Sequence, residues 1–136
     1  MNLLAIPFVQ TVGLTEDQNG RLTLPFQTTV HNHLQTMHAS AQFTLAETAS
    51  GQLLLTLFPE LEGKVLPVLR SSEVKFKKPA TQELFAHATV SDEARLRFHK
   101  QLETKKRANI TVDVSLEDKD GTVTCTGSFD WFVQAL

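Results

Sequence analysis

The segment between Arg21 and Glu60 is almost free of charge. Its 38 positions hold one charged residue, Glu47, although 21% of the whole chain is charged and roughly eight would be expected. Glu47 stands within a helix-like run of small and apolar residues from His38 to Gly51. A carboxylate in apolar surroundings needs a hydrogen-bonding or charged partner, or has a functional role, because burying it alone costs free energy. The segment therefore predicts a buried helix that carries one acid of functional interest.

This helix is predicted over residues 38–57. Its apolar residues follow helical spacing on more than one face, and a helix that is apolar nearly all round belongs in a protein interior. Pro59 ends it. The apolar positions are Ala41, Phe43, Leu45, Ala46, Ala49, Leu53, Leu54 and Leu57.

Extended segments flank the predicted helix. Residues 6–12 are expected to be extended, and the Asn19-Gly20 pair predicts a hairpin between residues 9–14 and 21–26. A polar loop is expected over residues 28–37. Four strands follow the helix, at residues 65–76, 83–92, 106–117 and 122–133. This order predicts one α+β domain over residues 1–136, with an antiparallel sheet wrapped around one central helix.

Bulk properties limit the partners. A net charge of −2 gives no case for nucleic acid or an anionic membrane. Cys125 is the single cysteine, so no intrachain disulfide forms, which fits a reducing compartment. The first residues lack the basic region and cleavage site of a signal peptide, and the longest apolar run is too short to span a bilayer. We expect a cytoplasmic protein with no membrane partner.

The residues around Glu47 resemble the hotdog-fold thioesterases, above all the phenylacetate-type acyl-CoA thioesterase branch. That fingerprint has an Asn, Gly-Thr three residues later, His-Gly-Gly at the helix start, and an acid followed by small residues. The run from Val74 to Ala80, VKFKKPA, is similar to the family's Phe/Tyr-x-x-Pro-Ala strand end. The likeness covers about residues 28–133 and implies a hotdog fold. The residues that match the first block in register are Asn32, Thr36, His38, Leu45, Ala46 and Glu47.

The chain departs from this fingerprint at its glycines. Gln35 replaces one glycine, and Ala39-Ser40 replaces the Gly-Gly pair. Side chains therefore stand where the family keeps the backbone bare, which predicts a narrower site or a differently shaped loop.

The resemblance implies hydrolysis of an acyl-CoA thioester. Backbone N–H groups at a helix start can stabilise an oxyanion, and the resemblance assigns this role to the N–H of Ala39. Glu47 would act as nucleophile or general base, with a pKa raised by its apolar surroundings. Asn32 would orient substrate or water. The expected substrate-binding residues are His38, Ser40, Ser71, Phe76 and Lys78.

Spacing adds a constraint on the site. Ala39 and Glu47 lie eight residues apart, about 12 Å along one helix. A thioester carbonyl must lie within about 3 Å of both its oxyanion donor and its attacking group. Two antiparallel helices from two copies of the chain would meet this need, as in hotdog dimers. We therefore expect a homodimer, with a homotetramer as the larger alternative.

Other interpretations remain open. A dehydratase or hydratase would pair His33 with Glu47, fourteen residues later, and a non-catalytic acyl-CoA-binding protein would explain the replaced glycines. The histidines at 31, 33 and 38 lack the spacing of a zinc site, so we expect no metal. We expect no cofactor beyond coenzyme A as part of the substrate. Its phosphates would meet one of three basic clusters, at residues 75–78, 95–100 and 105–107.

Overall fold

Helix α2 (Ala39–Leu57) forms the centre of the computed structural model, which describes residues 1–136. His38 caps its first turn, because the side-chain Nδ1 accepts a hydrogen bond of 2.9 Å from the N–H of Ser40. Phe58 ends the helix, and Pro59 begins the short 3-10 helix η3 (Pro59–Leu61). The helix predicted over residues 38–57 is confirmed.

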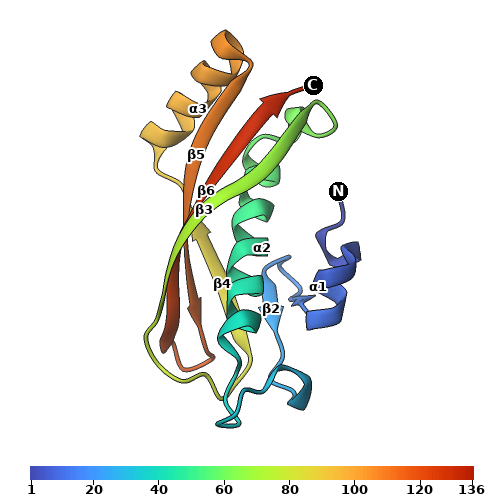
Figure 1. Ribbon diagram of the computed structural model, residues 1–136, viewed down its shortest axis with the longest axis vertical. Coiled ribbons are helices and arrows are strands. Elements are labelled where there is room, and N and C mark those ends of the chain that lie inside the picture. The colour runs from blue at the N-terminus through green and yellow to red at the C-terminus, as the bar shows by residue number, and fades with distance from the viewer.

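An antiparallel sheet of six strands wraps around α2 (Figure 1), which confirms the expected α+β architecture. The strand order is β1-β2-β4-β5-β6-β3. Strand β3 pairs with β6 alone, so its other edge carries backbone groups without partners in the chain. The strands are β1 (Thr15–Glu16), β2 (Leu22–Leu24), β3 (Val65–Phe76), β4 (Leu84–Thr89), β5 (Arg107–Glu117) and β6 (Val123–Ala135).

Alternation along the strands separates an inner face from an outer face. On β5 every second residue from Ala108 to Leu116 is buried. On β6 Phe129 is fully buried, pairs with Val112, and meets the ring of Phe43 edge-on at 5.6 Å. The core therefore fills the space between α2 and the inner face, while the outer face carries mainly polar residues.

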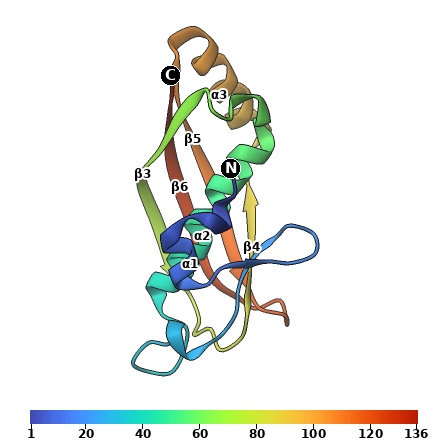
Figure 2. The ribbon, with the colours of Figure 1, turned by 90° about the vertical axis from the view of Figure 1, so that its right-hand side faces the viewer.

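Two short helices open the chain, η1 (Leu3–Ala5) and α1 (Pro7–Val12). The prediction of an extended segment at residues 6–12 is wrong. Pro7 occupies the first helical position, where its missing N–H costs nothing, and Gly13 ends the helix with a φ of 99°. Figures 1 and 2 show α2 lying between α1 and the sheet.

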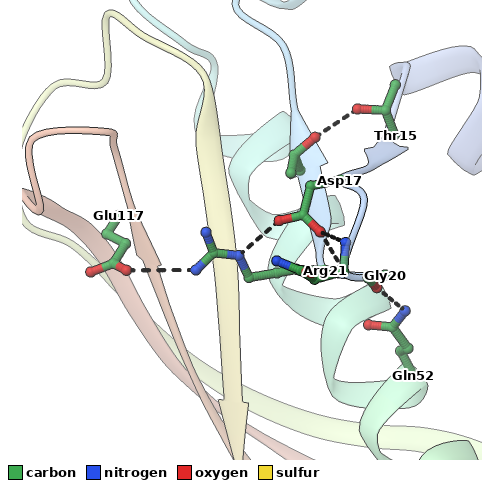
Figure 3. Close-up of polar contacts among 8 residues, drawn as sticks. Thr15, Asp17, Gly20, Arg21, Gln52 and Glu117 are labelled. Carbon is green, nitrogen blue, oxygen red and sulfur yellow. Dashed lines mark hydrogen bonds and ion pairs between the residues drawn. The ribbon is translucent and has the colours of Figure 1, made fainter.

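The predicted Asn19-Gly20 turn joins β1 to β2, but the first strand is β1 rather than residues 9–14. Figure 3 shows how this hairpin is held. The Nε2 of Gln52 on α2 donates to the carbonyl of Gly20 at 3.0 Å, and Arg21 lies 3.9 Å from the carboxylate of Glu117 on β5. The hairpin is therefore tied both to the central helix and to the sheet.

Helix α3 (Asp92–Lys105) has no counterpart in the sequence prediction, which continued a strand to residue 92. Strand β4 stops at Thr89, and the Ser91 side chain accepts a hydrogen bond from the N–H of Ala94. The ring of Phe98 is buried 4.7 Å from that of Phe58, which packs α3 at the end of the molecule where α2 finishes. None of the helices has both the length and the hydrophobicity needed to cross a membrane.

Candidate functional site

Glu47 lies in the third turn of α2 with its side chain half-buried. No hydrogen bond or ion pair within the chain reaches its carboxylate, while its backbone carbonyl accepts from the Ser50 hydroxyl. Burial raises the pKa of the carboxyl above its ordinary value of 4.5. The acid singled out by the sequence is thus sheltered and unpartnered, which leaves it free to act on a ligand.

Glu47 borders a pocket of about 510 Å³. Of the 21 residues that line this pocket, 14 are hydrophobic, so its walls favour an apolar ligand group. The walls come from η1 and α1 on one side, from α2 and the segment that follows it, from the start of β3 and the end of β6, and from Phe98 of α3. Aromatic walls close to Glu47 include Phe43, one turn before it on α2, and Trp131 of β6.

The start of α2 leaves one backbone donor free. The N–H of Ser40 is bound by His38, and the N–H groups of Ala41 and Gln42 both donate to the carbonyl of His38, at 3.0 and 3.1 Å. The N–H of Ala39 has no acceptor in the chain, as expected at a first helical position, and Ala39 is exposed. The N–H of Ala39 is therefore free to bind a ligand, whereas that of Ser40 is occupied.

A buried side chain fixes this helix start in place. The Oε1 of Gln42 accepts a 3.1 Å hydrogen bond from the Thr124 hydroxyl on β6. The Thr124 carbonyl in turn accepts from the N–H groups of Lys77 and Lys78, at 2.8 and 3.3 Å. The exposed Lys78 is therefore held at the same end of the molecule as Ala39.

Phe76, the last residue of β3, also lies near this end, and half of its surface is exposed. The basic residues of α3 lie at the opposite end (Figure 1). Three basic clusters could meet coenzyme A phosphates, and the one at residues 75–78 lies next to the start of α2.

Asn32 organises the loop that leads into α2. Its Oδ1 accepts hydrogen bonds from the N–H groups of Leu34 and Thr36, at 2.9 and 3.1 Å, and its Nδ2 donates to the Thr36 hydroxyl at 2.8 Å. Gln35 adopts a φ of 59°, the left-handed conformation that favours glycine. The backbone thus keeps a glycine-type turn at the position where the fingerprint has glycine. His33 is exposed on this loop.

Ser71 is not brought together with Glu47. Its hydroxyl donates to Asp130 at 2.6 Å on the outer face of the sheet, where Thr111 donates to the other oxygen of the same carboxylate. These two hydrogen bonds hold the pKa of Asp130 below its usual range. Ser72 pairs with the buried Phe129 and so lies on the inner face.

Two further kinds of candidate group are metal ligands and the single thiol, that of Cys125. No group of three or more His, Cys, Asp or Glu side chains converges in an arrangement that could hold a metal ion. Cys125 is buried, and burial raises the pKa of its thiol to about 11. A thiol with so high a pKa is poorly suited to nucleophilic chemistry at neutral pH.

Two features of the pocket were not predicted. The N-terminal helices supply one wall, which an extended segment would not have done, and Gly51 lies against Trp131. Pro7 and Gly13 are the signals that could have revealed the first feature. A lone glycine inside a predicted helix signals close packing, but it does not say against which residue.

These features define the class of protein: one long helix wrapped by an antiparallel sheet is the hotdog fold of thioesterase structures. A family model described as a domain of unknown function, DUF4442, matches residues 1–133, and the chain belongs to that family. No curated protein sequence matches the chain.

Solved structures share the fold over nearly the whole chain. A protein of unknown function and probable thioesterase from Pseudomonas aeruginosa is 25% identical, with a TM-score of 0.85 over 98% of this chain and 91% of that one. A Bacillus halodurans protein solved with CoA is 24% identical, with a TM-score of 0.69 over 90% of this chain and 72% of that one. A thioesterase from Haemophilus influenzae is 16% identical, with a TM-score of 0.76 over 98% and 87%.

Proposed function

We propose that the protein hydrolyses acyl-CoA thioesters, with Glu47 as the attacking group or general base. The observation that carries this proposal is the unpartnered carboxylate of Glu47 at the edge of an apolar pocket. The similar proteins from Pseudomonas aeruginosa, a probable thioesterase, and Bacillus halodurans, solved with CoA, support the choice of substrate.

The proposed reaction needs both halves of the site. As general base, Glu47 takes a proton from water while the water oxygen bonds to the thioester carbon. The carbonyl oxygen gains negative charge, which the N–H of Ala39 stabilises. The C–S bond then breaks, the thiol leaves with the proton, and the acid product is released. As nucleophile, Glu47 instead bonds to the carbonyl carbon, the C–S bond breaks, and the thiolate leaves and takes up a proton from solvent. Water then cleaves the resulting anhydride, which releases the acid product and restores the Glu47 carboxylate.

We further propose that a second copy of the chain completes each site. About 12 Å of helix separates Ala39 from Glu47, so one α2 does not supply both groups to one carbonyl. The unpaired edge of β3 offers a surface on which a second copy of the chain can pair. Ala39 is exposed, so its N–H is free to approach that second copy. Two α2 helices running antiparallel would then present each Ala39 N–H to the partner's Glu47. Lys78, beside that helix start, would meet coenzyme A phosphates.

A panel of acyl-CoA esters tests the proposal. The Glu47→Gln variant should lose about 10²- to 10⁴-fold in kcat, the usual worth of a general base. Glu60→Gln is the matched control, because Glu60 is exposed and does not line the pocket. Hydrolysis that persists in Glu47→Gln would overturn the role of Glu47. Binding of acyl-CoA without turnover by the unaltered protein would favour the non-catalytic alternative, and hydration of a crotonyl thioester would favour the hydratase.

A further inference from the structure

The pocket is long as well as apolar. Along α2 and its C-cap residue the lining runs from Phe43 to Phe58, and Glu47 lies one turn from the end nearest the helix start. The eleven residues from Glu47 to Phe58 correspond to about 16 Å along the helix axis. Most of the pocket therefore extends beyond the acid, toward the end of α2.

The walls beyond Glu47 offer no free polar group to a ligand over most of this length. Beyond Glu47, the one hydroxyl side chain in the lining is that of Thr48, and it donates to the carbonyl of Thr44 at 2.6 Å. Apart from Glu47, the charged groups in the lining are the Glu62 carboxylate, beside Gly63 after the helix end, and the N-terminal ammonium of Met1, and these two form an ion pair with each other. A ligand group that fills this space must be apolar.

The dimensions indicate the size of that group. A fully extended chain of single bonds advances about 1.2 Å per bond, since three peptide backbone bonds span at most about 3.6 Å. About 16 Å thus holds roughly thirteen bonds. The volume of about 510 Å³ would hold about seventeen groups of the size of a water molecule, at roughly 30 Å³ each.

Building on the proposed function, we infer that the substrate carries a straight fatty acyl chain of roughly twelve to sixteen carbons, which lies along α2 from Glu47 toward Phe58. Gly51 is the residue that keeps this path open. It lies one turn beyond Glu47, and a Cβ there would be 3.4 Å from Cζ2 of Trp131.

The Trp131 ring is fixed in position, because its Nε1–H donates to the Ser50 hydroxyl at 2.9 Å and that hydroxyl donates to the Glu47 carbonyl at 2.6 Å. A large side chain at residue 51 would therefore project into the pocket rather than displace the ring. It would close the path about 6 Å beyond Glu47, after roughly five bonds of an acyl chain.

The first test compares Gly51→Leu with Thr56→Leu. Both place leucine, a good helix former, on α2, but Thr56 is exposed and outside the pocket. The readout is the ratio of kcat/KM for dodecanoyl-CoA to that for butyryl-CoA. We expect the unaltered protein to favour dodecanoyl-CoA by about 100-fold or more, given the free energy of burying each methylene. Gly51→Leu should reduce this ratio at least about tenfold, and Thr56→Leu should leave it unchanged. A preference for butyryl-CoA, or an unchanged ratio in Gly51→Leu, would overturn the inference.

A binding measurement separates this inference from the proposed reaction. Calorimetry on Glu47→Gln gives the Kd of dodecanoyl-CoA and butyryl-CoA without turnover. Tighter binding of dodecanoyl-CoA, weakened in the Glu47→Gln, Gly51→Leu double variant, supports the acyl path even if no thioester is hydrolysed. Glu47-dependent hydrolysis with no chain-length discrimination would instead leave the proposed function standing and refute the acyl path.

Discussion

The start and the middle of α2 are opposite environments on one helix. At the start, Ala39 is exposed and its N–H has no acceptor in the chain. In the middle, Glu47 is sheltered by apolar walls and its carboxylate has no donor. The start has a free N–H donor and the middle has a free carboxylate, yet about 12 Å of helix separates these two groups. This contrast supports the proposal that one chain holds two incomplete halves of a site rather than one finished site.

Of three changes along this part of the chain, removing the free donor at the helix start should have the largest effect, and that effect is on kcat. Ala39→Pro deletes the N–H at a first helical position, where proline is well tolerated. His38 already has the extended backbone that a following proline requires, with φ −61° and ψ 138°. We expect kcat to fall about 10²- to 10³-fold with the fold intact by circular dichroism. Ala39→Ser keeps the N–H and should retain activity; equal losses in both variants would show that the N–H is not the relevant group.

The burial of Glu47 in the middle of α2 should affect the thermal stability of the folded protein. Because burial raises the pKa of Glu47, its ionised form destabilises the folded protein at neutral pH. Its favourable contribution is present below the ordinary pKa of 4.5 and is lost as the pH rises through the folded pKa. Glu47→Gln should therefore raise the Tm at pH 7, and the gain should vanish near pH 4. A gain of the same size at both pH values would mean that desolvation of the charge is not its cause.

The loop before the helix start should give the smallest effect. Gln35 has a φ of 59°, a conformation that costs a non-glycine residue about 1–2 kcal/mol. Glycine would relieve this cost but lose about 0.5–1 kcal/mol in chain entropy on folding. Gln35→Gly should thus raise the free energy of unfolding by about 0.5–1 kcal/mol in urea titrations. Gln35→Val should lower it, since a β-branched residue tolerates a positive φ poorly. Destabilisation by glycine would contradict the glycine-type turn.

The sequence could predict the elements whose patterns are regular. The central helix and strand β3 (Val65–Phe76) match their predicted ranges, because a long apolar helix and a strand bounded by proline are strong local signals. The sequence does not predict helix α3 because its apolar stripe is sparse: Phe98 and Leu102 are its only buried residues. The cap at Ser91 and the acids in the first turn, Asp92 and Glu93, were its available signals.

The geometry of the site could be predicted only in part. The register of Glu47 with His38 and Ala39 is local to one helix, so the sequence carries it. The face on which Ser71 lies is not local, because the pairing of β3 with β6 shifts between Leu69 and Ser71. Such a bulge reverses the alternation of side chains, so counting residues along the strand does not say which serine faces the helix.

Activity in mixed dimers tests the central claim most directly. Glu47→Gln and Ala39→Pro chains with different affinity tags can be co-expressed, and the dimers that carry both tags isolated. If the two groups of each site come from different copies, one of the two sites in every mixed dimer is intact, so activity should recover to about half that of the unaltered dimer. Mixed dimers no more active than either parent would show that one chain must supply both Ala39 and Glu47, which would contradict the shared site.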